Sequence, residues 1–226
     1  MVEVTRHGQR APEKIFNLTL DPEANFKVPH NLTMAGALNH HATGQTLRQV
    51  LEVLMPGFLS AEYVPEEVYV QTTCHARTID SAVAQLEGLY GMPLQFPDWD
   101  PTYEMTTMLC NEDYLLRMSR DMCHRYDRVR HAVQTEIATE LMYSEIDYDM
   151  ERSGFYEKLR QLTGHKGDSL HHMHQLCDYI YWALESGLEL SFTMTEEEYR
   201  RCMITKEKGV YSEFYAHEEL TALPIH

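Results

Sequence analysis

The sequence predicts an α/β fold: a layered α/β core with a partly parallel sheet, plus an inserted cap domain that is mainly helical. Two short β-forming runs, at residues 2–5 and 68–70, are each followed by apolar residues at helical spacing. From about residue 96, β-branched runs become rare, and Met, Tyr and charged residues dominate. The alternation of strand and helix predicts the core, and the change of composition predicts the insertion.

The first strand and helix follow from local patterns. Residues 2–5 suit a short buried strand, because their two valines fall on one face. Gly8 then lets the backbone turn tightly. After a loop that contains three prolines, Thr33 can cap a helix, which Pro56-Gly57 ends.

The second strand and helix repeat this order. Residues 68–70 are rich in β-formers, and two threonines follow within three residues. Ile79 to Tyr90 keep close to the helical repeat, and Gly91 and Pro93 close that helix.

The same patterns divide the chain. We expect the first half of the α/β core at residues 1–95, the helical insertion at residues 96–200 and a return toward the core at residues 201–226. Helical spacing recurs within the insertion at residues 114–116, 133–141 and 176–184. Because the chain opens in a strand-like run without a signal-peptide pattern, we expect that it is truncated at the front.

The charge of the chain narrows the range of partners. The 226 residues carry a formal net charge of −16, from 35 acidic and 19 basic side chains. Such a surface repels nucleic acid and anionic lipid, so we expect no nucleic-acid partner. There is no apolar run of eighteen residues, so we also expect no membrane span. A site for a small anion would have to concentrate the few arginines locally.

Cysteines and glycosylation sequons bear on the compartment. The five cysteines lack CxxC spacing, which disfavours a zinc or redox motif, although some could pair in an oxidising lumen. Their pairing stays open. Asn17 and Asn31 each begin an Asn-Leu-Thr sequon. Together these features favour a glycoprotein that is secreted or resident in a lysosome-like lumen.

The segment RHGQRAP, residues 6–12, carries the clearest chemistry. It places the imidazole of His7 after a predicted strand, between the guanidiniums of Arg6 and Arg10. Arginine suits phosphate because it is planar, permanently charged and able to bind two oxygens at once. A neutral histidine can attack phosphorus once such cations neutralise the phosphoryl oxygens.

Arg77 offers a third cation. It follows the second predicted strand and opens the second predicted helix, so we expect it at the same sheet edge as His7. The helix N-terminus adds partial positive charge there.

These segments resemble the histidine acid phosphatase family, the acid phosphatase and phytase branch of the histidine phosphatase superfamily. Residues 6–12 match the family's RHGxRxP signature, residues 32–48 resemble its LTxxG and GxxLR segments, and residues 68–82 are similar to VYxRSTxxxRTxxSA. Residues 179–188 match the cap helix YDxLxxExxH more loosely, with Ile and Leu in place of its Asp and His. Gln71 also departs from the family's arginine.

The resemblance implies an acid phosphatase that hydrolyses small phosphate monoesters without a metal or cofactor. His7 would become the phosphohistidine, and Arg6, Arg10 and Arg77 would hold the phosphoryl oxygens. The resemblance leaves a homodimer open. The absence of an added lysine cluster favours small or lipid monoesters over highly phosphorylated inositols.

The family's second catalytic pair, His-Asp, is absent from the sequence. The look-alike His217-Glu218 lacks a preceding β-rich run, so we expect the chain to end before that segment. The general acid is then either Glu218 or an aspartate beyond the chain end. If the acid is truly missing, the alternative is an inactive phosphate-binding relative. Gln9 and the residues after it argue against a phosphoglycerate-mutase-like enzyme.

Other polar clusters receive simpler interpretations. A group on one predicted helix could suggest a metal site, but a polar helix face is favoured: His171, His172, His174 and Cys177. His40 and His41 are interpreted as helix-surface or packing residues. Glu196 to Glu198 fit a solvated first helical turn capped by Thr195.

Overall fold

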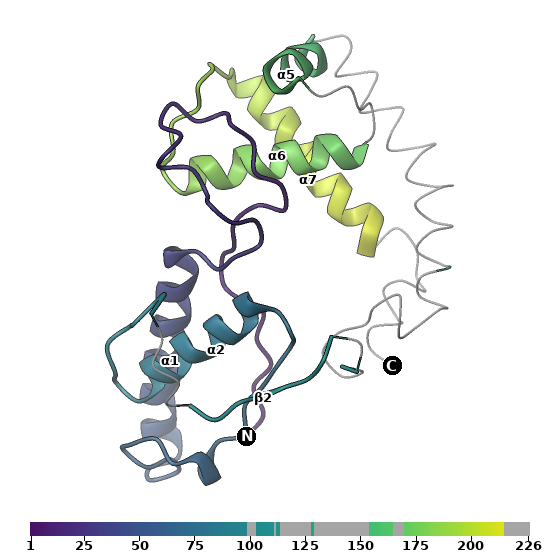
Figure 1. Cartoon of the computed structure of the whole chain (residues 1–226). Coiled ribbons are helices and arrows are strands. Elements are labelled where there is room, and N and C mark those ends of the chain that lie inside the picture. The colour runs from purple at the N-terminus through teal and green to yellow at the C-terminus, as the bar shows by residue number, and fades with distance from the viewer. Residues whose placement is uncertain (99–102, 111, 114–127, 129–153, 165–169, 215–226) are drawn as a thin grey trace. The chain divides into compact units, whose positions relative to one another are not determined.

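The computed structural model describes residues 1–98, 103–110, 112–113, 128, 154–164 and 170–214. The chain divides into two compact units. One comprises Met1–Ala11 and His30–Arg117, and the other comprises Pro12–Pro29 and Met118–His226. Figure 1 shows helices in both units, and the first unit also contains a short pair of parallel strands. The predicted α/β class is confirmed, whereas the predicted domain boundaries stay a prediction.

Two helices packed against each other build the first unit. Helix α1 spans Met34–Leu54 and helix α2 spans Ala76–Leu89. Their backbones approach closely at Gly44 and Gly88, where an added Cβ would collide with backbone atoms of the other helix. The rest of the unit comprises three short elements: the 3-10 turn η1 (Pro65–Glu67) and the strands β1 (Gln71–Thr72) and β2 (Thr106–Thr107).

Both helices of this unit confirm the sequence prediction. The Thr33 hydroxyl accepts a hydrogen bond of 3.1 Å from the Gly36 N–H and caps α1. Helix α2 stops at Leu89, and Gly91 follows with a φ of +67°, a backbone conformation that glycine adopts without strain.

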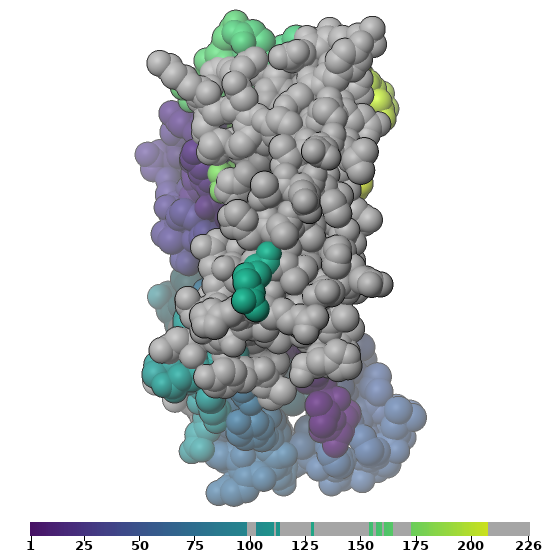
Figure 2. All heavy atoms as spheres, turned by 90° about the vertical axis from the view of Figure 1, so that its right-hand side faces the viewer, coloured from purple at the N-terminus to yellow at the C-terminus, as the bar shows by residue number. Residues whose placement is uncertain are grey.

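The predicted strand at residues 2–5 is wrong. The segment forms no strand, and the side chains of Val2 and Val4 are 90% and 83% exposed. Purple atoms of the N-terminal segment are visible at the surface in Figure 2. A strand needs a neighbouring strand to pair with. Within the described ranges, the N-terminal segment pairs only after residues 2–5, in a single antiparallel bridge from Arg10 to Leu32.

The second predicted strand is displaced. Residues 68–70 are irregular, and β1 begins at Gln71, where it pairs in parallel with β2. The Val70 carbonyl still accepts from the Thr106 N–H at 2.9 Å, and the Thr72 and Thr107 hydroxyls lie 2.9 Å apart. The position of the partner strand therefore decides where pairing starts. The β-forming composition of residues 68–70 does not indicate that position.

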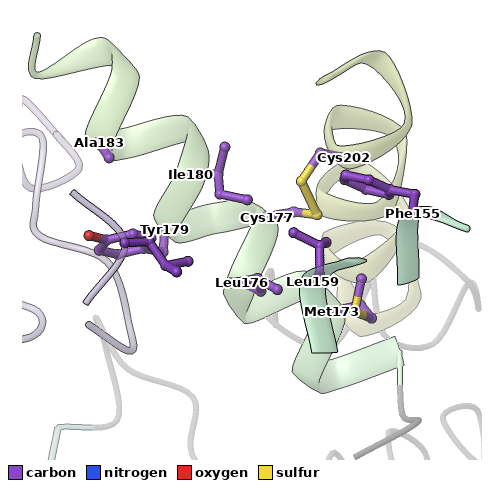
Figure 3. Packing of buried hydrophobic residues seen from close by; sticks show 10 residues of the cluster. Phe155, Leu159, Met173, Leu176, Cys177, Tyr179, Ile180, Ala183 and Cys202 are labelled. Atoms are coloured by element: carbon purple, nitrogen blue, oxygen red, sulfur yellow. A yellow bond between two sulfur atoms is a disulfide. The ribbon is translucent and has the colours of Figure 1, made fainter. Parts of the chain in front are cut away.

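The second unit is helical. It contains α5 (Phe155–Thr163), α6 (Leu170–Glu185) and α7 (Glu196–Phe214). Figure 3 shows their shared core, in which Phe155 and Leu159 of α5 lie near the disulfide between Cys177 of α6 and Cys202 of α7. The predicted helix at residues 176–184 lies within α6 and is confirmed.

The loop of residues 12–29 belongs to this helical unit. Leu18 is buried in the core, and Thr19 forms an antiparallel bridge with Leu190. The buried Tyr179 donates its hydroxyl to Asn25 Oδ1 at 3.1 Å. A proline-containing segment that the sequence presents as a plain loop therefore supplies part of a hydrophobic core.

The predicted cap of α7 is also confirmed. The Glu198 N–H donates to the Thr195 hydroxyl at 3.2 Å, and the Thr195 N–H donates to Glu198 Oε2 at 2.7 Å. Three sequence predictions lie outside the described residues: the helices at 114–116 and 133–141, and the pair His217-Glu218. The helices that the structure describes include none suited in length and hydropathy to crossing a membrane.

Candidate active site

The RHGQRAP segment is fixed to the start of α1. The Gln9 carbonyl accepts from both the backbone N–H and the hydroxyl of Thr33, at 2.9 and 3.1 Å. The Ala11 N–H donates to the Asn31 carbonyl at 2.7 Å. These bonds place the segment beside the positive end of the α1 dipole, where anions are favoured.

Gly8 permits a close approach between this segment and α1. A Cβ at this position would lie 2.6 Å from the Gly36 carbonyl oxygen and 2.9 Å from Cδ2 of the His40 ring. Gly36 faces the same contact from the helix side, since its Cβ would collide with the backbone of Gln9. The two glycines therefore let the segment's backbone lie directly on the first turn of the helix.

Ser81 of α2 joins the two segments that carry the predicted site. Its hydroxyl accepts from the Gly8 N–H at 3.0 Å and donates to the Arg77 carbonyl at 2.7 Å. Gly8 follows His7 in the chain, and Arg77 lies in the first turn of α2. One side chain thus connects the neighbour of His7 to the backbone of Arg77, across 73 residues of sequence.

The turn before Arg77 is itself held in place. Cys74 is joined to Cys110 by a disulfide, which ties the start of α2 to the segment after β2. The Thr78 hydroxyl lies 2.6 Å from the His75 carbonyl and 3.1 Å from the Thr73 carbonyl, both of which can accept from it. The backbone of Arg77 is therefore held by the disulfide of Cys74 before it and by the hydrogen bonds of Thr78 after it.

Electrostatics link all four predicted site residues. Burial lowers the pKa of His7 below its usual 6.5, and the charges of Arg77, Arg6 and Arg10 lower this pKa further. The hydrogen bond to the Gly8 carbonyl acts in the opposite direction and raises it. The three arginines are thus near enough to act on one imidazole, and together with burial they favour its neutral form.

The hydrogen bonding of His7 also selects a tautomer. Nδ1 lies 2.8 Å from the Gly8 carbonyl, which can only accept, so Nδ1 carries the proton. In the neutral ring the lone pair then resides on Nε2. The Arg10 side chain is held in part by the next residue, because its Nη1 donates to the Ala11 carbonyl at 2.9 Å.

Sequence reasoning missed part of the site's support. His40, interpreted as a surface or packing residue, is buried, and its Nε2 lies 3.1 Å from the Arg6 carbonyl. A usable signal was its spacing, since Gly36, His40 and Gly44 lie four residues apart on one helix face. Two glycines on one helix face indicate that another segment packs closely there, so a histidine between them is expected to hydrogen-bond that segment.

The other histidine cluster has a structural contact. His174 Nδ1 lies 3.0 Å from the Lys206 carbonyl and so links α6 to α7. Among the residues that the structure describes, no group of three potential metal ligands comes together.

Comparison with known proteins gives a consistent similarity. The family model described as histidine phosphatase superfamily (branch 2) matches residues 1–216. Lysosomal acid phosphatase of Bos taurus is 31% identical over 193 residues, which cover 82% of this chain and 43% of the relative. Testicular acid phosphatase of Homo sapiens is 32% identical over 200 residues, which cover 83% and 43%.

Prostatic acid phosphatase of Bos taurus is 28% identical over 225 residues, which cover 96% of this chain and 55% of that protein. This chain thus spans about half, or less, of the length of these three relatives. Among solved structures, the phytase from Citrobacter braakii superposes with a TM-score of 0.56 at 18% identity, covering 92% of this chain and 59% of the phytase. The Klebsiella sp. ASR1 phytase has a TM-score of 0.56 at 16% identity, with 95% and 58% covered.

Proposed function

Because the chain belongs to branch 2 of the histidine phosphatase superfamily, we propose that it acts as an acid phosphatase on phosphate monoesters. In this proposal His7 is the nucleophile and carries a phosphohistidine intermediate. The observation that carries the proposal is that Arg77, Arg6 and Arg10 all act electrostatically on one partly buried imidazole. Three cations whose charges act on a ring that favours its neutral form would suit a tetrahedral dianion.

The first step is phosphoryl transfer to His7. The Nε2 lone pair attacks phosphorus, the N–P bond forms, and the bond from phosphorus to the ester oxygen breaks. The leaving oxygen takes a proton from a general acid, for which Glu218 and an aspartate beyond the chain end both stay open. Water then attacks phosphorus and returns a proton to the deprotonated acid, the N–P bond breaks, and phosphate and neutral His7 are released.

The arginines supply the stabilisation of charge in both steps. Arg6, Arg10 and Arg77 would hold the equatorial oxygens of the transferred group, where negative charge is spread in the transition state. The first turns of α1 and α2 would add backbone N–H groups of the same polarity. No metal ion or cofactor has a part in this scheme.

We propose a secreted or lysosome-like lumenal setting for the protein. Two disulfides, Cys74–Cys110 and Cys177–Cys202, support an oxidising compartment. The sequon residues Asn17 and Asn31 are both exposed, as N-glycan acceptors must be. Within this setting small or lipid phosphate monoesters are the proposed substrates, and a homodimer remains a further proposal.

The decisive experiment traps the intermediate. The protein is mixed with p-nitrophenyl [³²P]phosphate and quenched, and acid-labile label on His7 is measured by mass spectrometry. We expect label in the wild type and in His41→Ala, but none in His7→Ala. Full turnover in His7→Ala would refute the nucleophile assignment.

Changing the leaving group separates an enzyme from an inactive relative. A p-nitrophenyl ester needs little help from a general acid, whereas glycerol phosphate needs a proton at its leaving oxygen. If the acid is missing, His7 is labelled from the first ester and poorly from the second. Comparable labelling from both would support Glu218 as the acid, while phosphate binding without any label would favour the inactive relative.

A further inference from the structure

A buried polar network lies behind the His7 segment, on the face of α1 that contacts it. His40 is 7% exposed, and each of its two ring nitrogens has a hydrogen-bond partner. Nε2 lies 3.1 Å from the Arg6 carbonyl, and Nδ1 lies 3.1 Å from Oε1 of Gln85 on α2. Gln85 in turn donates from Nε2 to both carboxylate oxygens of Glu3, at 2.9 Å each.

His40 contacts the chain on both sides of His7. It bonds the carbonyl of Arg6, the residue before, and its Cδ2 would lie only 2.9 Å from a Cβ at Gly8, the residue after. The Gly8 carbonyl is also the group that accepts from His7 Nδ1. A shift of the His40 ring would therefore move both peptide groups that determine where the His7 ring lies.

From these contacts we infer that His40 is a positioning residue for phosphoryl transfer, and that Gln85 and Glu3 hold it in place. The inference rests on the proposed function of His7. His40 itself does not contact the phosphoryl group in this scheme. It fixes the Arg6 and Gly8 peptides so that Nε2 of His7 is presented to the phosphorus atom.

The direction of the hydrogen bonds sharpens the inference. The Glu3 carboxylate accepts from Gln85 Nε2, so the amide presents Oε1, an acceptor, to His40. The Arg6 carbonyl is also an acceptor. Each ring nitrogen of His40 thus has a partner, and a buried network is strongest when every member is satisfied.

The same helix offers a matched control. His41 is the next residue, and its Nε2 also lies within hydrogen-bond distance of a backbone carbonyl, that of Met92, at 2.7 Å. Met92 follows α2 and lies outside the His7 segment. His41→Ala therefore removes a similar bond from the same helix while the peptides of Arg6 and Gly8 keep theirs.

The test measures the rate of His7 phosphorylation in single turnovers with saturating p-nitrophenyl phosphate. We expect His40→Ala to slow this step about 100-fold, the scale of a small misplacement of a reacting group, with substrate affinity nearly unchanged. His40→Gln, which keeps one donor toward the Arg6 carbonyl, should recover part of the rate, and His41→Ala should match the wild type. A folded His40→Ala protein with the wild-type rate would overturn the inference.

Two further measurements keep the outcome decisive. If His40→Ala does not fold, Gln85→Leu removes both the acceptor of His40 Nδ1 and the donor to Glu3, and an unchanged phosphorylation rate would count against the network. In ¹⁵N spectra, His40→Ala should shift the Nδ1–H signal of His7. These spectra need no turnover: if His7 is never phosphorylated the proposed function fails, whereas an unmoved His7 signal rejects the positioning role alone.

Discussion

The charges of Arg77, Arg6 and Arg10 all act on the imidazole of His7, and in the proposed function they would have two effects. They would provide positive charge for a phosphoryl dianion, and they lower the pKa of the imidazole proposed to attack it. A nucleophile that works in an acidic compartment must stay neutral there, and burial of the ring lowers its pKa in the same direction. In the proposed function, charge neutralisation of the substrate and activation of the nucleophile would thus come from the same side chains.

Replacing Arg77 should change both effects, and a different measurement reports each of them. Arg77→Ala removes a cation that lowers the pKa of His7, so that pKa should rise toward its usual value. The acid limb of His7 phosphorylation should then move to higher pH, because the neutral ring is lost as pH falls through the pKa. Inhibition by inorganic phosphate should weaken about 10- to 100-fold, the loss expected for a charge-assisted hydrogen bond.

The control for this variant is Arg200→Ala. Arg200 bonds Glu197 on the exposed surface of α7 in the other unit, so its loss should change neither measurement. Melting temperatures should agree closely between Arg77→Ala and the wild type. An unchanged inhibition constant for phosphate in Arg77→Ala would argue against its place in the site.

The site residues differ in how far sequence could predict them. His7 and its flanking arginines lie within one contiguous motif, and Arg77 follows a β-forming run at a recognisable helix start. His40 and Gln85 could not be predicted in the same way, because their partners lie 34 and 45 residues away. Hydrogen bonds of that range depend on how α1 and α2 pack, which spacing along the chain does not encode.

At the scale of elements, the contact between α1 and α2 determines how the site is built. One helix contacts the His7 segment through Gly36 and His40, and the other carries Arg77 and Ser81. The close approach at Gly44 therefore also fixes the spacing between the two halves of the site.

Gly44→Ala should destabilise the protein by about 1–3 kcal/mol, the cost of overpacking a tight contact. The new Cβ would collide with the Gln85 carbonyl and lie 2.7 Å from the Leu89 nitrogen. Helix propensity alone predicts the opposite sign, since alanine is favoured over glycine by about 1 kcal/mol. Urea unfolding measures the difference directly.

Thr43→Ala is the neighbouring control for this helix. The Thr43 hydroxyl donates only back to the Asn39 carbonyl on an exposed surface, so the change should be small. Stabilisation by Gly44→Ala would show that the two helices can separate without cost. Gly44→Ala should also slow His7 phosphorylation, since it widens the distance between α1 and α2.

Helices and strands differ in predictability for a physical reason. The start of α1 at Thr33 and the capped turn at Thr195 depend on neighbours three residues away. The strand β1 depends on Thr106–Thr107, more than thirty residues ahead, and residues 2–5 stay exposed despite a strand-like pattern. Pairing partners decide where strands form, and sequence composition does not identify them.

At the scale of the whole molecule, each unit has its own covalent link. Cys74–Cys110 closes a separation of 36 residues in the first unit, and Cys177–Cys202 closes 25 residues in the second. Five cysteines left this pairing open from sequence, because connectivity depends on which chain segments meet in space. Loop-closure entropy assigns about 3–4 kcal/mol of stability to each link.

The two links should have different functional effects. Replacing Cys74 and Cys110 by alanine frees the turn before Arg77, so phosphate inhibition should weaken and unfolding should become easier. The matched pair, Cys177→Ala with Cys202→Ala, should lower stability by a similar amount and leave phosphate inhibition unchanged. Equal effects of both pairs on inhibition would contradict the assignment of the first link to the site, and peptide mapping without reductant checks the pairing itself.

The loop of residues 12–29 imposes an order of events during synthesis. It is translated well before its partner Tyr179, which follows Asn25 by 154 residues. At about 5–20 residues per second, the ribosome needs roughly 8–30 s to supply that partner. Until then the apolar side chains of Phe16, Leu18 and Phe26 have no helical core to enter. The apolar side chains of this segment therefore stay exposed to solvent on the nascent chain for many seconds, until the helices that bury them have been synthesised.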